Sequence, residues 1–235
     1  MKNLTLTICL TLAILLGSAG TSWGADFNKG IAAYKSGDYA TALREWRPLA
    51  EQGHIGARMY LGFMYQEGHG VLQDYKTALK WFTLAAEQGD DLAQKAVGLM
   101  YQEGLGVPQD YKTAVKWLTL SAEQGNASAQ STLGLMYQEG WGVPQDYKTT
   151  VKWFTLAAEQ GHASAQSFLG FKYVLGQGVI KDNVYAHMWW NIASSNGDEK
   201  AGEHRDDLAK QMTPAQIEKA QDLARECVRK EYKGC

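Results

Sequence analysis

The apolar positions along most of the chain recur at the spacing of amphipathic helices. In the segment 129–137, Ala129, Leu133, Met136 and Tyr137 stand at i, i+4, i+7 and i+8, and together they form one apolar face of a helix. A second apolar set follows after a short polar stretch, and its members are Val151, Trp153, Phe154, Ala157 and Ala158. The pattern therefore predicts two helices in succession.

Turn and cap residues separate these two predicted helices. The first ends in a Glu-Gly-x-Gly-Val stretch at 139–143, where a glycine can adopt the left-handed conformation that closes a helix. Asp146 is suited to the N-cap of the second helix, and Pro144 just before it discourages any continuation from the loop. Gly161 closes the second helix. The unit is thus predicted to be a helical hairpin.

This hairpin is one of several copies with a period of 36 residues. Residues at equivalent places are Gly53, Gly89, Gly125, Gly161 and Gly197; Tyr65, Tyr101, Tyr137 and Tyr173; Asp74, Asp110, Asp146 and Asp182; and Trp81, Trp117, Trp153 and Trp189. They define four full units, 54–89, 90–125, 126–161 and 162–197. Because one hairpin cannot bury its own apolar face, we expect successive hairpins to stack into an α-solenoid.

The repeated pattern resembles a known family. From Ala57 to Gly89 the chain reads Ala-x-x-x-Leu-Gly-x-x-Tyr-x-x-Gly-x-Gly-Val-x-x-Asp-x-x-x-Ala-x-x-Trp-x-x-x-Ala-Ala-x-x-Gly, which is similar to the Sel-1-like repeat, a relative of the tetratricopeptide repeat. The resemblance covers residues 54–197 and implies an all-α, right-handed solenoid. The last copy departs from the pattern at Tyr173-Val174-Leu175-Gly176 and at Asn183, as expected for a unit that adjoins a cap.

The flanking segments are predicted to cap the stack. Residues 26–53 form an N-terminal hairpin closer to a plain tetratricopeptide hairpin, because its turn at Ser36-Gly37 lacks the longer glycine loop. Residues 198–235 are predicted to form C-terminal capping helices, with Thr213-Pro214 as N-cap and first helical residue. The expected buried stripe of the final helix consists of Ile217, Ala220, Ala224, Cys227 and Val228.

The first 25 residues have the pattern of a cleaved signal peptide. Met1-Lys2 precedes an apolar run at 4–16, and small residues follow toward a cleavage site after Gly24 or Ala25. The apolar run is too short for a transmembrane helix, which needs about 20 residues. We therefore expect a periplasmic or secreted protein with no membrane anchor after cleavage. The formal charge of −2 shows no basic excess, so nucleic acid is not an expected partner.

Two cysteines, Cys227 and Cys235, remain in the mature chain. An even number in an oxidising compartment favours a disulfide between them. The alternative is two free thiols, with Cys227 packed as a small apolar side chain. A metal site is disfavoured because no histidine or further cysteine stands nearby at ligand spacing.

Nothing in the sequence has the pattern of an active site. The five histidines, His54, His69, His162, His187 and His204, lie in different repeat contexts without a His-Glu-x-x-His or other ligand spacing. There is no Gly-x-Ser-x-Gly elbow, phosphate-binding loop or dinucleotide fingerprint. We predict no enzyme activity, no catalytic residue, no metal and no cofactor.

The side of the first helices opposite their apolar face is the predicted binding surface. In the related solenoids the first helices line the concave side, which implies partner contacts from this face. The candidate partner-binding residues are Met59, Phe63, Gln66, Lys95, Leu99, Gln102, Leu135, Gln138 and Phe171. In particular, Phe63, Leu99, Leu135 and Phe171 would form an apolar ladder. The alternative is that adjacent repeats bury this ladder. The repeated tyrosines and tryptophans are predicted core residues, whereas Trp190 is the aromatic expected to be exposed.

These observations and the resemblance together imply a binding protein. The predicted function is a periplasmic or secreted scaffold or adaptor, expected to be a monomer, that binds another protein or peptide. One alternative is a periplasmic immunity protein that neutralises a secreted toxin such as a phospholipase, since the family includes such inhibitors. A weak β-lactam-binding or hydrolysing enzyme is a third reading, although the relatives with that activity carry cysteine pairs within their repeats and this chain does not.

Overall fold

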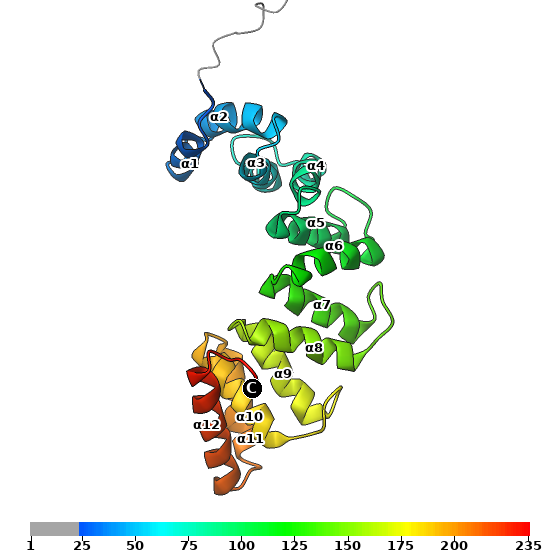
Figure 1. Ribbon diagram of the computed structural model, residues 1–235, viewed down its shortest axis with the longest axis vertical. Helices are drawn as coiled ribbons and strands as arrows, with labels where there is room; N and C mark the ends of the chain where they lie inside the picture. The colour runs from blue at the N-terminus through cyan, green and yellow to red at the C-terminus, as the bar shows by residue number, and fades with distance from the viewer. Residues whose placement is uncertain (1–23) are drawn as a thin grey trace, which may run out of the picture. The chain divides into compact units, whose positions relative to one another are not determined.

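The computed structural model describes residues 24–235 as helices joined by short loops, with no strand in that range. The signal peptide expected at 1–25 lies almost wholly outside the described residues. The described chain falls into two compact units, one ending at Gln73 and the other spanning Asp74–Cys235, and each is described by itself. The all-α class expected from the periodicity is confirmed (Figure 1).

Among the described residues, the first unit contains three helices and the second contains nine. The three are α1 (Phe27–Lys35), α2 (Tyr39–Glu51) and α3 (Ile55–Glu67). The nine are α4 (Tyr75–Ala86), α5 (Asp91–Glu103), α6 (Tyr111–Glu123), α7 (Ala127–Glu139), α8 (Tyr147–Ala158), α9 (Ala163–Leu175), α10 (Asn183–Ser195), α11 (Glu199–Ala209) and α12 (Pro214–Arg229). In the second unit α6, α7, α8 and α9 each pack on the next, so every hairpin rests on its neighbour (Figure 1).

The helix ends are set by the residues that the sequence suggested. Asp146 caps α8 by accepting a hydrogen bond from the Lys148 backbone N–H at 2.9 Å. Gly140 ends α7 in the left-handed conformation, with φ of 73°. Thr213 and Gln216 form a reciprocal capping box at the start of α12.

The second glycine of each loop joins one repeat to the one before it. Gly106 has φ of 72° and lies so close to the start of α4 that a Cβ would sit 2.5 Å from the Tyr75 carbonyl carbon. Gly142 lies in the same way against the Tyr111 carbonyl at the start of α6. Only glycine meets both demands, because other residues avoid positive φ and would clash. Each loop is therefore a joint between neighbouring repeats.

Buried glutamine side chains make a second joint between repeats. They donate to main-chain carbonyls of the preceding repeat and accept from an amide at the end of their own repeat: Gln94 donates to Ala86 O and accepts from Gln124, Gln130 donates to Ala122 O and accepts from Gln160, and Gln166 donates to Ala158 O and accepts from Asn196. The amide-to-amide distances are 2.7, 2.8 and 2.9 Å. Buried polar atoms are thus paired at each of these three positions.

The aromatic core predictions need two corrections. Trp190 was expected to be exposed, but only 4% of it is, and its indole N–H donates to the Ser167 carbonyl at 3.0 Å. Its ring packs over Gly170 at the place that Phe154 occupies over Gly134. The repeated tyrosines and Trp81, Trp117 and Trp153 are half-buried rather than core, whereas Trp189 is buried because α12 packs on α10 and covers it.

The final helix matches the predicted cap with one exception. Ala220, Ala224 and Cys227 are buried against α10, and Ile217 is half-buried. Val228 is about half exposed, because the helical rotation places it beside the stripe rather than on it.

Candidate protein-binding surface

In the second unit, second helices of the repeats flank the first helices α7 and α9 on two sides. The helix α7 packs against α6 on one side and α8 on the other, and α9 packs against α8 and α10 in the same way. Leu99, Leu135 and Phe171 lie at equivalent positions on α5, α7 and α9, and all three are half-buried. These three residues, which we call the strip, therefore fit both the predicted binding role and the alternative of packing between repeats, because each is partly covered and partly exposed.

Leu135 and Phe171 both pack against neighbouring side chains. Leu135 packs against the cluster that contains Phe154 and Leu169. The Phe171 ring meets Trp190 and His204 edge-on, with ring centroids 5.1 and 4.8 Å apart. In the first unit Phe63 is 39% exposed at the equivalent sequence position.

The expectation that Met59 projects from the surface is wrong. Only 7% of it is exposed, and Ser131 and Ser167, at the equivalent positions of later repeats, are buried as well. The reason is that a first helix sandwiched between two second helices buries residues on both flanks, so a simple two-faced helix overestimates the free face. Lys95, at the same position in α5, is half-exposed.

The candidate glutamines occupy an ordered polar edge. Gln66, Gln102 and Gln138 each donate through the side-chain amide to the glutamate that follows, at 2.8, 3.0 and 2.7 Å. Their main-chain carbonyls each accept from a loop glutamine, which for Gln138 is Gln145 at 2.6 Å. The Oε1 atom of Gln102 is buried and takes part in no hydrogen bond within the described residues.

A cavity of about 380 Å³ opens at the Gln138 and Phe171 end of this strip. Its lining comes from α7, α8, α9 and the two loops beside them: Gln138, Glu139, Gln145, Tyr147, Phe168, Phe171, Lys172, Leu175 and Gln177. Aromatic and aliphatic walls, three amides, one carboxylate and one amine thus meet in one hollow. Two of the predicted partner-binding residues, Gln138 and Phe171, belong to it.

Lys172 is the unusual member of this cavity. Its equivalents in the other three repeats are the buried Met64, Met100 and Met136, yet Lys172 is equally buried, with 3% exposed. Its Nζ donates to Gln177 Oε1 at 2.8 Å and lies 5.2 Å from the centre of the Tyr147 ring.

Burial lowers the pKa of the Lys172 amine, and the Glu139 carboxylate opposes that effect. Lys172 is not among the predicted binding residues, although the change from methionine to lysine at a 36-residue interval is a sequence signal that singles it out.

The histidines serve as caps and packing groups. His54 and His162 cap α3 and α9 by accepting a backbone N–H through Nδ1. His69 stacks on Tyr39 with centroids 4.8 Å apart, and its Nδ1 lies 2.9 Å from the Tyr34 hydroxyl. His187 is buried with Nδ1 unpaired, and His204 packs on Phe171. Within residues 24–235 no three histidine, cysteine or acidic side chains are grouped to hold a metal ion.

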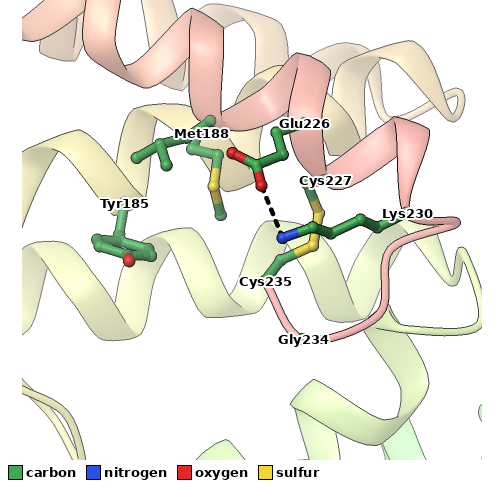
Figure 2. A pocket seen from close by; sticks show the side chains of 8 residues that line it. Tyr185, Met188, Glu226, Cys227, Lys230, Gly234 and Cys235 are labelled. Atoms are coloured by element: carbon green, nitrogen blue, oxygen red, sulfur yellow. Dashed lines mark ion pairs between the residues drawn. A yellow bond between two sulfur atoms is a disulfide. The ribbon is translucent and has the colours of Figure 1, made fainter.

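A disulfide joins Cys227 to Cys235, with their Cα atoms 5.5 Å apart, and it holds the last residues beside α12. Figure 2 shows it beside a smaller cavity of about 230 Å³, which is lined by Tyr185 and Met188 of α10 and by Glu226 and Lys230, an ion pair of 2.7 Å. The Gly234 N–H donates to Glu159 Oε1 at 3.0 Å, and the Tyr232 hydroxyl donates to Asn196 at 3.1 Å. The terminal residues are thereby tied to two repeats.

None of the helices among the described residues is long and apolar enough to cross a lipid bilayer.

Comparison with known proteins identifies the repeats. The Sel1 repeat model matches residues 56–90, 91–126, 127–162 and 163–198. The crystal structure of a Sel1 repeat protein from Oxalobacter formigenes is 33% identical, superposes with a TM-score of 0.73, and covers 77% of this chain and 75% of its own.

Two further relatives share less of their length. A protective antigen present in uropathogenic Escherichia coli strains, which displays an SLR fold, is 32% identical with a TM-score of 0.77, over 95% of this chain and 49% of the antigen. A curated protein of Rhizobium leguminosarum bv. viciae, described as an exopolysaccharide production negative regulator, is 45% identical over 47 residues, which are 20% of this chain and 18% of that protein. The chain therefore spans about half of the antigen and less than a fifth of the regulator.

Proposed function

Because the chain belongs to the Sel1 repeat family, whose members are generally protein–protein interaction scaffolds, we propose that it binds a protein or peptide along the first helices of its repeats. The observation that carries this proposal is the strip of half-exposed Leu99, Leu135 and Phe171, which ends in the Lys172 cavity. Apolar side chains flanked by fixed amides are suited to partner capture, because the apolar atoms supply affinity and the amides supply direction.

We also propose that the protein works outside the cytoplasm, as a periplasmic or secreted scaffold. Support comes from the Cys227–Cys235 disulfide, since such bonds persist in oxidising compartments. Protein recovered from the periplasm or medium should resist thiol alkylation until it is reduced. Free thiols in that fraction, or recovery in the cytoplasm alone, would contradict export.

A pair of matched double variants tests the binding strip. Leu99→Ser with Leu135→Ser changes the strip on α5 and α7, while Leu120→Ser with Leu156→Ser changes exposed leucines on α6 and α8. Affinity capture from envelope extracts, followed by mass spectrometry, should lose its specific partner with the first pair and keep it with the second.

Circular dichroism and thermal melting of both double variants show whether the helical fold is retained. Equal capture by the two pairs would overturn the assignment of the strip. Collapse of the fold in the Leu99 and Leu135 pair alone would show that these side chains belong to the core instead.

A further inference from the structure

The cavity beside Lys172 carries chemistry that the other repeats do not have. At the equivalent positions of repeats two and three, the side chain is a methionine buried in the core. An amine at this position is costly unless it is paired, because burial removes its hydration. In Lys172 the pairing is partial: one neutral oxygen, from Gln177, and one ring face, from Tyr147.

The nearest carboxylate does not complete this pairing. Glu139 lines the same cavity and accepts a hydrogen bond from the Gln138 amide at 2.7 Å, but it forms no ion pair with Lys172. An ammonium group has three donors and forms its strongest hydrogen bonds with anionic oxygens. The cavity therefore offers an incoming anionic oxygen a place beside the amine.

The walls of the cavity restrict which anion fits. Phe168, Phe171 and Leu175 line the same cavity as Lys172 with apolar surface, and Leu175 is 59% exposed. A single positive charge with Glu139 nearby favours a monoanion over a doubly charged phosphate, since Glu139 would repel the second charge. Apolar walls also favour a ligand in which the anion is directly attached to an apolar group.

We propose that this cavity binds a peptide segment in which a carboxylate stands next to an apolar side chain, with the carboxylate on Lys172 and the apolar group against Phe168, Phe171 and Leu175. The carboxylate is either the C-terminus of a partner or an acidic side chain. This inference rests on the proposed function, because the cavity continues the binding strip at Gln138 and Phe171.

Three labelled peptides test the proposal and separate the two sources of carboxylate. The first is fluorescein-Gly-Ser-Gly-Ser-Ala-Phe with a free C-terminus, the second is its C-terminal amide, and the third is the amide with Asp in place of Ala. Fluorescence anisotropy with the full chain should show binding of the first, the third or both, and none of the second at the same concentration. Equal binding of all three, or no binding of any up to about 1 mM, would overturn the proposal.

A variant that restores the residue of the other repeats gives the decisive comparison. Lys172→Met should weaken binding of the carboxylate peptide about tenfold or more and leave the melting temperature unchanged or higher. The matched control Lys116→Met removes an exposed lysine of α6 that lies outside the cavity and outside the predicted binding surface, and it should leave peptide binding unchanged. Unchanged binding by Lys172→Met, or an equal loss with Lys116→Met, would contradict the assignment.

A second measurement does not depend on any variant. In the labelled wild-type protein, whichever carboxylate peptide binds should shift the NMR signals of Tyr147, Phe171 and Gln177, and shifts confined to other residues would overturn the site. Partner capture that depends on Leu99 and Leu135 without peptide binding would remove this inference and leave the proposed function intact. Capture indifferent to Leu99 and Leu135 would remove the proposed surface, whichever peptide binds.

Discussion

The Trp141 ring, at the tip of one repeat's loop, stacks on the Tyr111 ring at the start of the preceding repeat's second helix. Their centroids are 5.5 Å apart and their planes are 15° from parallel. In the first unit His69 and Tyr39 stand in the same relationship. The variable residue between the two loop glycines therefore contributes to the joint between repeats.

A double-mutant cycle should detect the energy of this stacking. Trp141→Ala and Tyr111→Ala, singly and together, should show a coupling of about 0.5–1.5 kcal/mol in urea unfolding, as measured for aromatic pairs. As a control, Trp141→Ala should not couple to Tyr185→Ala, because Tyr185 stacks on Tyr173 instead. Coupling near zero in the first cycle would show that the stacking adds nothing to stability.

Two loop glycines that share the same backbone conformation should differ in their tolerance of alanine. Gly104 and Gly106 both have φ of 72°, so Ala at either costs about 1–2 kcal/mol from the left-handed conformation. At Gly106 the Cβ would also meet the Tyr75 carbonyl carbon at 2.5 Å, whereas at Gly104 the nearest atom is at 3.3 Å. We therefore expect Gly106→Ala to be the more destabilising by at least about 1 kcal/mol in urea unfolding. Equal losses would mean that the neighbouring repeat yields easily.

Loss of the disulfide should destabilise the C-terminal end. Replacing Cys227 and Cys235 together by Ala should lower the free energy of unfolding by about 2–3 kcal/mol, because the reduced chain gains entropy when unfolded. Hydrogen exchange at the Gly234 amide, which donates to Glu159, should become faster. Wild-type protein treated with reductant is the control and should behave as the double variant does. An unchanged exchange rate would show that the hydrogen bonds of the terminal residues hold them without the disulfide.

Acid should destabilise the protein partly through His187. Burial lowers the pKa of its imidazole, the Arg205 guanidinium lowers it further, and the Asp206 carboxylate opposes them. The folded state therefore takes up a proton less readily than the unfolded chain, whose histidine titrates near 6.5. The contribution of His187 to the free energy of unfolding is therefore fully present above the unfolded-state pKa. It is lost as the pH falls from there through the lower folded-state pKa.

The matching variant is His187→Val, which restores the residue found at Val151. The loss of melting temperature between about pH 7.5 and 5.5 should be smaller in this variant than in the wild type. His162, whose pKa burial also lowers, is present in both proteins, so it cancels in the comparison. Equal losses would show that His187 does not contribute.

Most of the local structure could be predicted from the sequence. The 36-residue period, the loop glycines and the capping aspartates define the helices and their ends, because a cap depends on a few neighbouring residues. Burial was harder to predict, since it depends on which helices pack on each side. Trp190 illustrates the difference. It follows Phe154 by one period, so the repeat pattern indicates a buried position. The prediction of an exposed ring rested instead on its neighbour Trp189, which was assigned to the core.

The candidate site likewise could be predicted only as far as local helix geometry allows. The periodic positions of Leu99, Leu135 and Phe171 could be placed from helix geometry alone. The Lys172 cavity could not, because Tyr147 and Gln177 come from other segments and only the folded chain brings them to the amine.

The loop glycines and buried glutamines of the second unit contact the repeat before them, and the glutamines also contact their own repeat. A copy inserted or deleted at a whole-period boundary would meet the same partner surfaces on both sides. Duplication of a gene segment can therefore lengthen such a chain without requiring new compensating mutations, which is one route to the close similarity of the segments 101–117 and 137–153. Selection can then act on single residues, such as Lys172, while the rest of the repeat continues to fold.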